Sequence, residues 1–118
     1  MLKLSPQSIG ILVGTLSMLC FVSAGRAEPG IFDDRIVFGQ SAAFKGPAAA
    51  LGLGMRQGIL AAFEEANAKG GVNGRKLELV SYNDGYEPNK AIVNTKRLLE
   101  EDKVFALLGE VGTPTSKA

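Results

Sequence analysis

Short apolar, β-branched runs alternate with helical patterns along most of this chain, and this alternation restricts the folds open to it. Strands are predicted at residues 35–40, 76–82 and 104–109. Between them, apolar residues recur at helical spacing over residues 51–69 and 89–101. An alternating order of strands and helices implies parallel strands with right-handed crossovers, so that helices cover both faces of the sheet. The sequence therefore predicts a three-layer α/β fold with a parallel sheet and a βαβαβ order.

Glycine, proline and asparagine mark the boundaries of these elements. The glycine pair at residues 70–71 follows the first helix, where glycine commonly ends a helix. Residues 72–75 (Val-Asn-Gly-Arg) predict a tight turn, and Pro88 suits the first position of the second helix. Thr113, followed by a proline, predicts the cap of a further helix. Residues 28–34, before the first strand, are expected to form a flexible lead-in.

The spacing of apolar residues also predicts which face of each helix packs on the sheet. In the first helix the inward residues are Met55, Ile59, Ala62, Phe63 and Ala66. In the second helix they are Ala91, Ile92, Thr95, Leu98 and Leu99. The last strand, residues 104–109, is apolar throughout, which is typical of a strand buried inside a parallel sheet.

The first 27 residues have the layout of an export signal. Lys3 precedes an uncharged, apolar run of 14 residues at 9–22, and small residues follow as far as Ala27. This order is typical of a secretory signal peptide, and the run is short against the ~20 residues of a membrane-spanning helix. Cleavage after Ala24 or after Ala27 fits the pattern, and we take Ala27. Residues 1–27 are therefore expected to be a signal peptide.

Composition excludes several classes of function. The chain has 13 Lys and Arg against 12 Asp and Glu, no His, and a single Cys, Cys20, in the apolar run of the leader. Without histidine there is no Ser-His or Cys-His pair, and one cysteine cannot supply the thiolates of a zinc or redox site. A net charge near zero offers no basic face to nucleic acid. We expect no catalytic residue, no metal site, no cofactor and no nucleic-acid partner.

Three glycines in the first helix do not form a nucleotide-binding motif. Gly52, Gly54 and Gly58 fail the G-x-G-x-x-G spacing because Gln57 occupies the third glycine position. We interpret them as small residues that let the helix approach the sheet. Asp84, after the second strand, is interpreted as a turn former.

The loops after the first and third strands are the expected ligand site. In a doubly wound sheet, ligands bind beyond the carboxyl ends of the strands, where the winding direction reverses. If the strand order is second, first, third, residues 41–51 and 110–116 meet there. Hydroxyls and a helix N-terminus in the second loop suit a carboxylate, so Gly112 and Thr113 are candidate ligand-binding residues, although a helix cap would explain Thr113 equally well. Glu110 is expected to face solvent or a cationic ligand group.

Taken together, residues 35–118 resemble the periplasmic solute-binding proteins of ABC importers, specifically the leucine/isoleucine/valine-binding family. The most specific part is the run EANAKGGVNGRK at residues 65–76. The likeness also rests on Phe44-Lys-Gly-Pro47, on Tyr82-Asn-Asp84 followed by Glu87-Pro88, and on the apolar strand at residues 104–109.

The resemblance implies the type I periplasmic binding protein fold, in which two lobes close on a ligand. Residues 28–118 would form the first part of the N-terminal lobe. It further implies a periplasmic protein that binds an amino acid, branched-chain or related, and delivers it to the membrane permease of an ABC importer. By the same resemblance, Gly112 and Thr113 would hold the α-carboxylate of the ligand. Leu51 and Phe44 are the candidate ligand-binding residues of the first loop, and Leu51 stands where an aromatic side chain often lines the pocket.

Two other readings share the predicted fold. One is the ligand-sensing domain of a receptor or regulator of amino acids or amides, and the cleavable leader favours the importer over it. The other is a secreted α/β enzyme, which the lack of a visible base, nucleophile or metal set disfavours. Subtracting 27 leader residues from 118 leaves 91, too few for two lobes. We therefore expect the sequence to be truncated, and the piece alone to bind its ligand weakly or not at all.

Overall fold

The computed structural model describes residues 28–118, so the predicted signal peptide at residues 1–27 lies outside the described residues. Within that range β1 (Arg35–Ala42), β2 (Lys76–Asn83) and β3 (Ala106–Leu107) form one parallel sheet in the order β2-β1-β3. The predicted three-layer α/β class is confirmed, with the first strand at the centre of the sheet.

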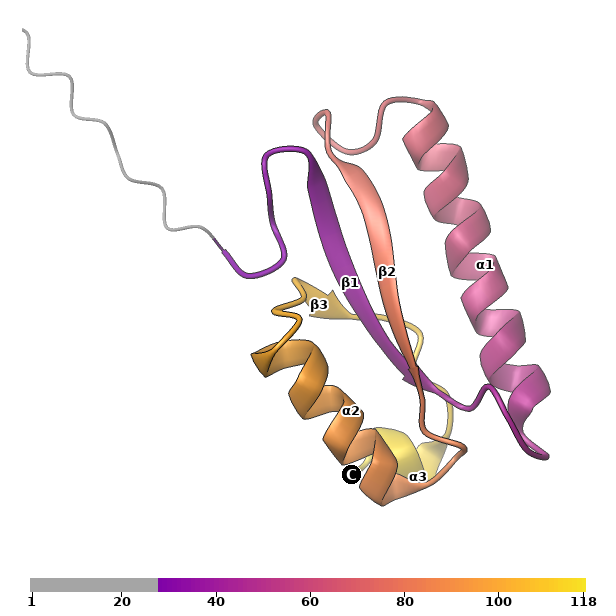
Figure 1. Ribbon diagram of the computed structural model, residues 1–118. Helices are drawn as coiled ribbons and strands as arrows, with labels where there is room; N and C mark the ends of the chain where they lie inside the picture. The colour runs from indigo at the N-terminus through magenta and orange to yellow at the C-terminus, as the bar shows by residue number, and fades with distance from the viewer. Residues whose placement is uncertain (1–27) are drawn as a thin grey trace, which may run out of the picture.

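The helices lie on the two faces of this sheet (Figure 1). Helix α1 (Ala49–Ala68) follows β1 and covers one face. Helix α2 (Pro88–Glu100) covers the other face, and α3 (Thr113–Ser116) packs beside α2. The described helices include none that is long and apolar enough to cross a membrane.

Alternate side chains of β1 supply the core on both faces. The Phe38 ring lies 5.4 Å from the ring of Phe63 in α1. The next residue back, Val37, packs with Leu98 of α2 and with Val104 on the opposite face. Because successive side chains of a strand point to opposite faces, one central strand can hold both helical layers. Full burial of Leu98 contributes about 1.5–3 kcal/mol to this packing.

Only one of the three helix glycines brings α1 close to the sheet. A Cβ at Gly52 would lie 1.9 Å from the carbonyl oxygen of Ala43, whereas a Cβ at Gly54 or Gly58 would meet nothing within 4 Å. Our interpretation of these glycines is confirmed at Gly52 and wrong at the other two. Gly52 shares a helix face with buried Ile59, two turns further on, and Gly54 and Gly58 do not.

The predicted inward faces of the helices are partly right. Ile59, Ala91 and Leu98 are buried. Four residues that were predicted to face inward are exposed instead: Met55, Ala62, Ile92 and Leu99. Among the described residues the sheet has three strands, one of them two residues long, so it covers only a narrow stripe of each helix.

Strand β3 is shorter and more exposed than its apolar sequence predicts. Besides the pairs made by Ala106–Leu107, Phe105 donates its N–H to Val37 O and Leu108 donates to Gly39 O, each at 2.8 Å. Phe105 is 45% exposed and Leu108 is 36% exposed. Complete burial was wrongly predicted, because within residues 28–118 only β1 pairs with this strand.

The segment before β1 is held in place rather than loose. Val37 donates its N–H to Gly30 O at 2.8 Å, and Ile31 forms an antiparallel bridge with Ile36. Gly30 has a φ of +71° and packs so closely that a Cβ there would lie 2.0 Å from the Phe105 nitrogen. The prediction of a flexible lead-in is wrong for these residues.

The turn signals, in contrast, are confirmed. Helix α1 ends at Ala68, and the glycines at 70 and 71 adopt φ values of +100° and +75° that end it. Asn73 and Gly74 also have positive φ, and Val72 bridges to Arg75 across the turn. Helix α2 begins at Pro88, as its sequence predicts.

Candidate functional site

The winding direction of the chain reverses at β1. The connection from β1 to β2 runs through α1 on one face of the sheet, and the connection from β2 to β3 runs through α2 on the other. The strand order is therefore second, first, third, which is the condition on which the expected ligand site depended. The carboxyl ends of β1 and β3 lie side by side, which is where a doubly wound sheet binds ligands.

On the face toward α1, Gln40 links the ends of the three strands. Its Nε2 donates to Gly109 O at 2.8 Å, and its Oε1 accepts a hydrogen bond from Ser81 Oγ at 3.1 Å. The side chain is fully buried. A buried amide with both ends bonded holds the strand ends in register, and the sequence analysis missed it because glutamine in a strand gives no local signal.

On the face toward α2, Asp84 has the same role. Its Oδ2 accepts a hydrogen bond from Ser41 Oγ at 2.9 Å, and its Oδ1 accepts one from the Tyr86 N–H at 2.8 Å. Asn94 of α2 donates to Ser41 Oγ at 3.2 Å. The bond to Tyr86, two residues on, supports the interpretation of Asp84 as a turn former. Its full burial and its bond to β1 are additional, and they make it a structural tie between the first two strands.

The two candidates of the first loop differ in how they are held. Phe44 donates its backbone N–H to Asn83 Oδ1 at 2.6 Å, and its half-buried ring lies 5.5 Å from the Arg56 guanidinium. Leu51, in the first turn of α1, is 60% exposed. Phe44 is thus fixed against the end of β2, while Leu51 presents an apolar side chain to the surface.

The candidates of the second loop lie in residues 110–116, which we call the β3 loop. Helix α3 begins at Thr113 and its N-cap residue is Gly112, without a side-chain capping bond, so the prediction that Thr113 is the cap is wrong. Gly112 makes this turn with a φ of +113°, which glycine adopts without steric cost. Thr115 donates its hydroxyl to Val111 O and Gly112 O instead. The exposed Thr113 hydroxyl is therefore not explained by capping.

The β3 loop also contacts the turn after β2. A Cβ at Gly112 would lie 2.5 Å from Cε2 of Tyr86, so the tyrosine ring rests directly against this glycine. Tyr86 is another residue that the sequence analysis missed. A tyrosine in a turn gives no sign of which distant loop it will touch.

Acidic groups lie close to the β3 loop. Partial burial raises the pKa of Glu110, and the nearby carboxylate of Asp84 raises it further. The Glu110 side chain is exposed, in agreement with the expectation that it faces solvent or a cationic ligand group. Residues 28–118 contain no group of three or more His, Cys, Asp or Glu placed to hold a metal ion.

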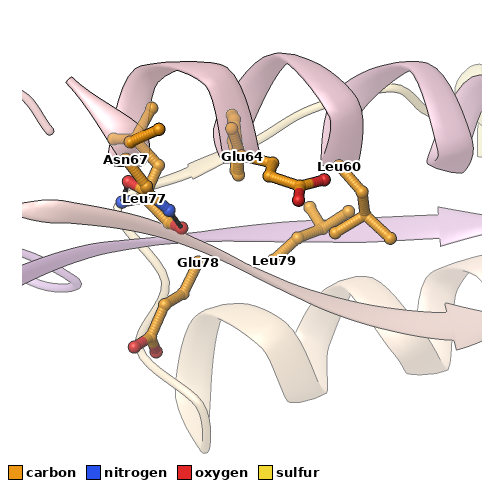
Figure 2. Close-up of a pocket in the computed structure, with 8 residues that line it drawn as sticks. Leu60, Glu64, Asn67, Leu77, Glu78 and Leu79 are labelled. Carbon is orange, nitrogen blue, oxygen red and sulfur yellow. Dashed lines mark hydrogen bonds between the residues drawn. The ribbon is translucent and has the colours of Figure 1, made fainter.

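A separate hollow lies between α1 and the outer edge of β2 (Figure 2). Leu77 and Leu79 point into it from the strand, whereas Glu78 points away. Asn67 of α1 satisfies both backbone hydrogen-bonding groups of Leu77 at the edge of β2. Its Nδ2 donates to Leu77 O at 3.0 Å and its Oδ1 accepts the Leu77 N–H at 2.8 Å. None of the candidate ligand-binding residues lines this groove. The candidate site is therefore the strand ends at β1 and β3.

Comparisons with known proteins point to one family. A family model described as a periplasmic binding protein matches residues 35–118. A leucine-, isoleucine-, valine-, threonine- and alanine-binding protein of Pseudomonas aeruginosa is 33% identical over 106 residues, which are 90% of this chain and 27% of that protein. The chain spans between 16% and 27% of the length of the curated relatives it matches.

Two solved structures have the same arrangement of elements. A possible leucine/isoleucine/valine-binding protein from Rhodopirellula baltica SH 1 matches with a TM-score of 0.69 and 49% identity, covering 71% of this chain and 23% of that one. A fatty acid ABC transporter substrate-binding protein from Thermomonospora curvata matches with a TM-score of 0.67 and 33% identity, covering 75% of this chain and 22% of that one.

Proposed function

The chain belongs to the periplasmic binding protein family, and from that premise we propose that it is part of the exported substrate-binding component of an ABC importer. Its ligand is an amino acid, branched-chain or related, which the protein delivers to a membrane permease. Residues 28–118 form the first part of a two-lobed protein, and the lobes close on the ligand. The leader at residues 1–27 directs export to the periplasm.

The observation that carries this proposal is the state of the β3 loop. Thr113 is exposed and free of a capping role, and Gly112 places backbone groups next to it at the switch point of the sheet. Hydroxyl and N–H donors in this arrangement suit the α-carboxylate of an amino acid. We propose Gly112 and Thr113 as the groups that hold it.

The remaining charges and apolar groups favour an amino acid over a simple anion. Glu110 adds an acidic group beside the proposed carboxylate site, and a zwitterion offers an ammonium group that tolerates it. Leu51, in the first turn of α1, and the Phe44 ring, in the loop before it, supply apolar surface, which suits an aliphatic side chain. We include both as ligand-binding residues in the proposal.

The test is calorimetric titration of the complete two-lobed protein with leucine, isoleucine, valine, aromatic amino acids and a medium-chain fatty acid. We expect at least one aliphatic amino acid to bind. Leucinamide is the matched control for leucine, because it keeps the side chain and the amine but lacks the carboxylate. It should bind more weakly by about 1–3 kcal/mol if a charged hydrogen bond to the β3 loop is lost.

The opposite outcomes identify the alternatives. Equal affinity for leucine and leucinamide would mean that the β3 loop does not bind the carboxylate. That result would favour the sensor of amino acids or amides. Binding of the fatty acid alone would keep the carboxylate but change the ligand class. Recovery of the bound amino acid unchanged after long incubation is expected of a transport protein, and turnover would contradict the proposal.

A further inference from the structure

We propose that Tyr86 is a positioning residue for the ligand: its ring holds Gly112, and through it Thr113, in the arrangement that receives the carboxylate. This inference rests on the function proposed above, because it assigns a support to the loop that the function uses. Tyr86 itself need not touch the ligand. It lies in the turn between β2 and α2, outside the β3 loop.

The first step is the contact between ring and glycine. Tyr86 Cε2 lies 2.5 Å and Cζ 3.0 Å from the point where a Cβ of Gly112 would be. A side chain at residue 112 would displace this ring. The tyrosine ring therefore forms a wall on one side of Gly112, and Thr115 Oγ1, at 2.8 Å from the same point, forms a second.

The backbone of Tyr86 is held by the end of β1 through Asp84. Its φ of +69° is uncommon for a bulky residue, which does not adopt it without support. The support is Asp84, which accepts the Tyr86 N–H with one carboxylate oxygen and the Ser41 hydroxyl with the other. Because Asp84 is fully buried and also bonded to Ser41, the backbone of Tyr86 is tied to the end of β1.

The Tyr86 side chain lies outside the hydrophobic core. Tyr86 is 37% exposed and does not belong to the cluster around Leu98. Its hydrogen bond to the described residues comes from the backbone N–H and not from the hydroxyl. The ring of Tyr86, and not its hydroxyl, is thus the part that contacts Gly112. A phenylalanine at residue 86 should therefore make the same contact.

The consequence for binding is preorganisation. A loop that is already ordered loses less conformational freedom when a ligand binds, and the affinity rises accordingly. Without the ring, Gly112 can sample the wide range of backbone conformations open to glycine. Thr113 would then occupy its binding position for only part of the time, which lowers the apparent affinity.

The experiment compares Tyr86→Ala with Tyr86→Phe in the complete protein. Amide exchange at Ser116 reports loop order without ligand, because this N–H bonds to Gly112 O at 2.9 Å. We expect exchange about tenfold faster in Tyr86→Ala and unchanged in Tyr86→Phe. Phe32→Ala is the matched control, an aromatic deletion at a residue of similar exposure in the lead-in. Tyr86→Asn removes the ring with a residue that tolerates positive φ, should Tyr86→Ala fold poorly.

A second arm measures leucine affinity by calorimetry. Tyr86→Ala should bind about tenfold more weakly, with Tyr86→Phe restoring wild-type affinity. Unchanged Ser116 exchange in Tyr86→Ala would overturn the inference, as would unchanged affinity in a wild type that binds leucine. A wild type that binds none of the amino acids would instead overturn the proposed function, while the exchange arm, which needs no ligand, would still decide the role of Tyr86.

Discussion

The two sides of β1 differ in how completely they are closed. Toward β2, the strands pair over eight residues. Ser41, near the end of β1, is bonded to Asp84, and Phe44, just after β1, is bonded to Asn83 at the end of β2. Toward β3, register pairing covers two residues, and the loop that follows exposes Thr113. The first side uses its polar groups for the fold. The side toward β3 leaves the Thr113 hydroxyl exposed to bind a ligand, and for this reason we place the ligand there.

The difference also separates residues that look alike in sequence. Asp84 and Glu110 are both acids just beyond a strand, and Thr113 and Thr115 are both hydroxyls in one loop. Asp84 and Thr115 are buried and bonded to the backbone or to Ser41, whereas Glu110 and Thr113 are exposed. Substitution of Asp84 should therefore change mainly stability, and substitution of Thr113 should change mainly ligand binding.

The largest effect on stability is expected for Asp84→Ala. The change leaves the buried Ser41 hydroxyl and the partly buried Tyr86 N–H without their acceptor, at a cost of about 3 kcal/mol in the free energy of unfolding. Urea denaturation measures it. Asp33→Ala, at an exposed position, controls for the loss of one acid. If Asp84→Ala lowers the free energy of unfolding no more than Asp33→Ala does, the hydrogen bonds between β1 and the end of β2 do not stabilise the fold as described.

A smaller effect is expected for Gly52→Ala. The added methyl group would meet Ala43 O and force α1 away from the end of β1, at a cost of about 2 kcal/mol. Gly58→Ala is the matched control in the same helix, since its Cβ would enter open space and alanine favours the helix by about 1 kcal/mol. Thermal denaturation should give opposite signs for the two, and the same sign for both would contradict the packing described.

The smallest effect concerns pH and Glu110. Because its pKa is raised above the ordinary 4.5, the folded state holds the proton more tightly, and stability falls as pH rises through the raised value. Glu110→Gln should therefore be slightly more stable than wild type at pH 7, and the difference should vanish below pH 4.5. Urea midpoints at the two pH values measure this, with Glu100→Gln on α2 as the control. A gain that persists at low pH would rule out ionisation as its cause.

The fold was predictable from local signals. Period-2 and period-3.6 patterns predicted the strands and helices, and glycines at 70 and 71 and Pro88 marked their limits correctly. The strand order did not follow from these signals: it was only assumed, and the structure supplies it as β2-β1-β3. Each of these signals lies within a few residues of the feature that it predicts.

Which polar side chains at the strand ends are hydrogen-bonded, and which are exposed, could not be predicted in the same way. Gln40 bonds to a carbonyl 69 positions away, and Ser41 bonds to an acid 43 positions away, so neither partner is visible in a local window. The cap of α3 was assigned to Thr113 because threonine is a good capping residue, yet Gly112 takes that place with a backbone conformation suited to glycine. Contacts between distant loops decide which hydroxyls remain available.

One measurement tests the central claim most directly: leucine affinity of the complete protein with Thr113→Ala, beside its stability. We expect a loss of about 1–3 kcal/mol in binding free energy with an unchanged unfolding midpoint, because the Thr113 side chain is exposed and caps no helix. Ser116→Ala, which removes another exposed hydroxyl of the β3 loop, should leave both values unchanged. Unchanged leucine affinity in Thr113→Ala would contradict the claim that the β3 side of β1 holds the ligand.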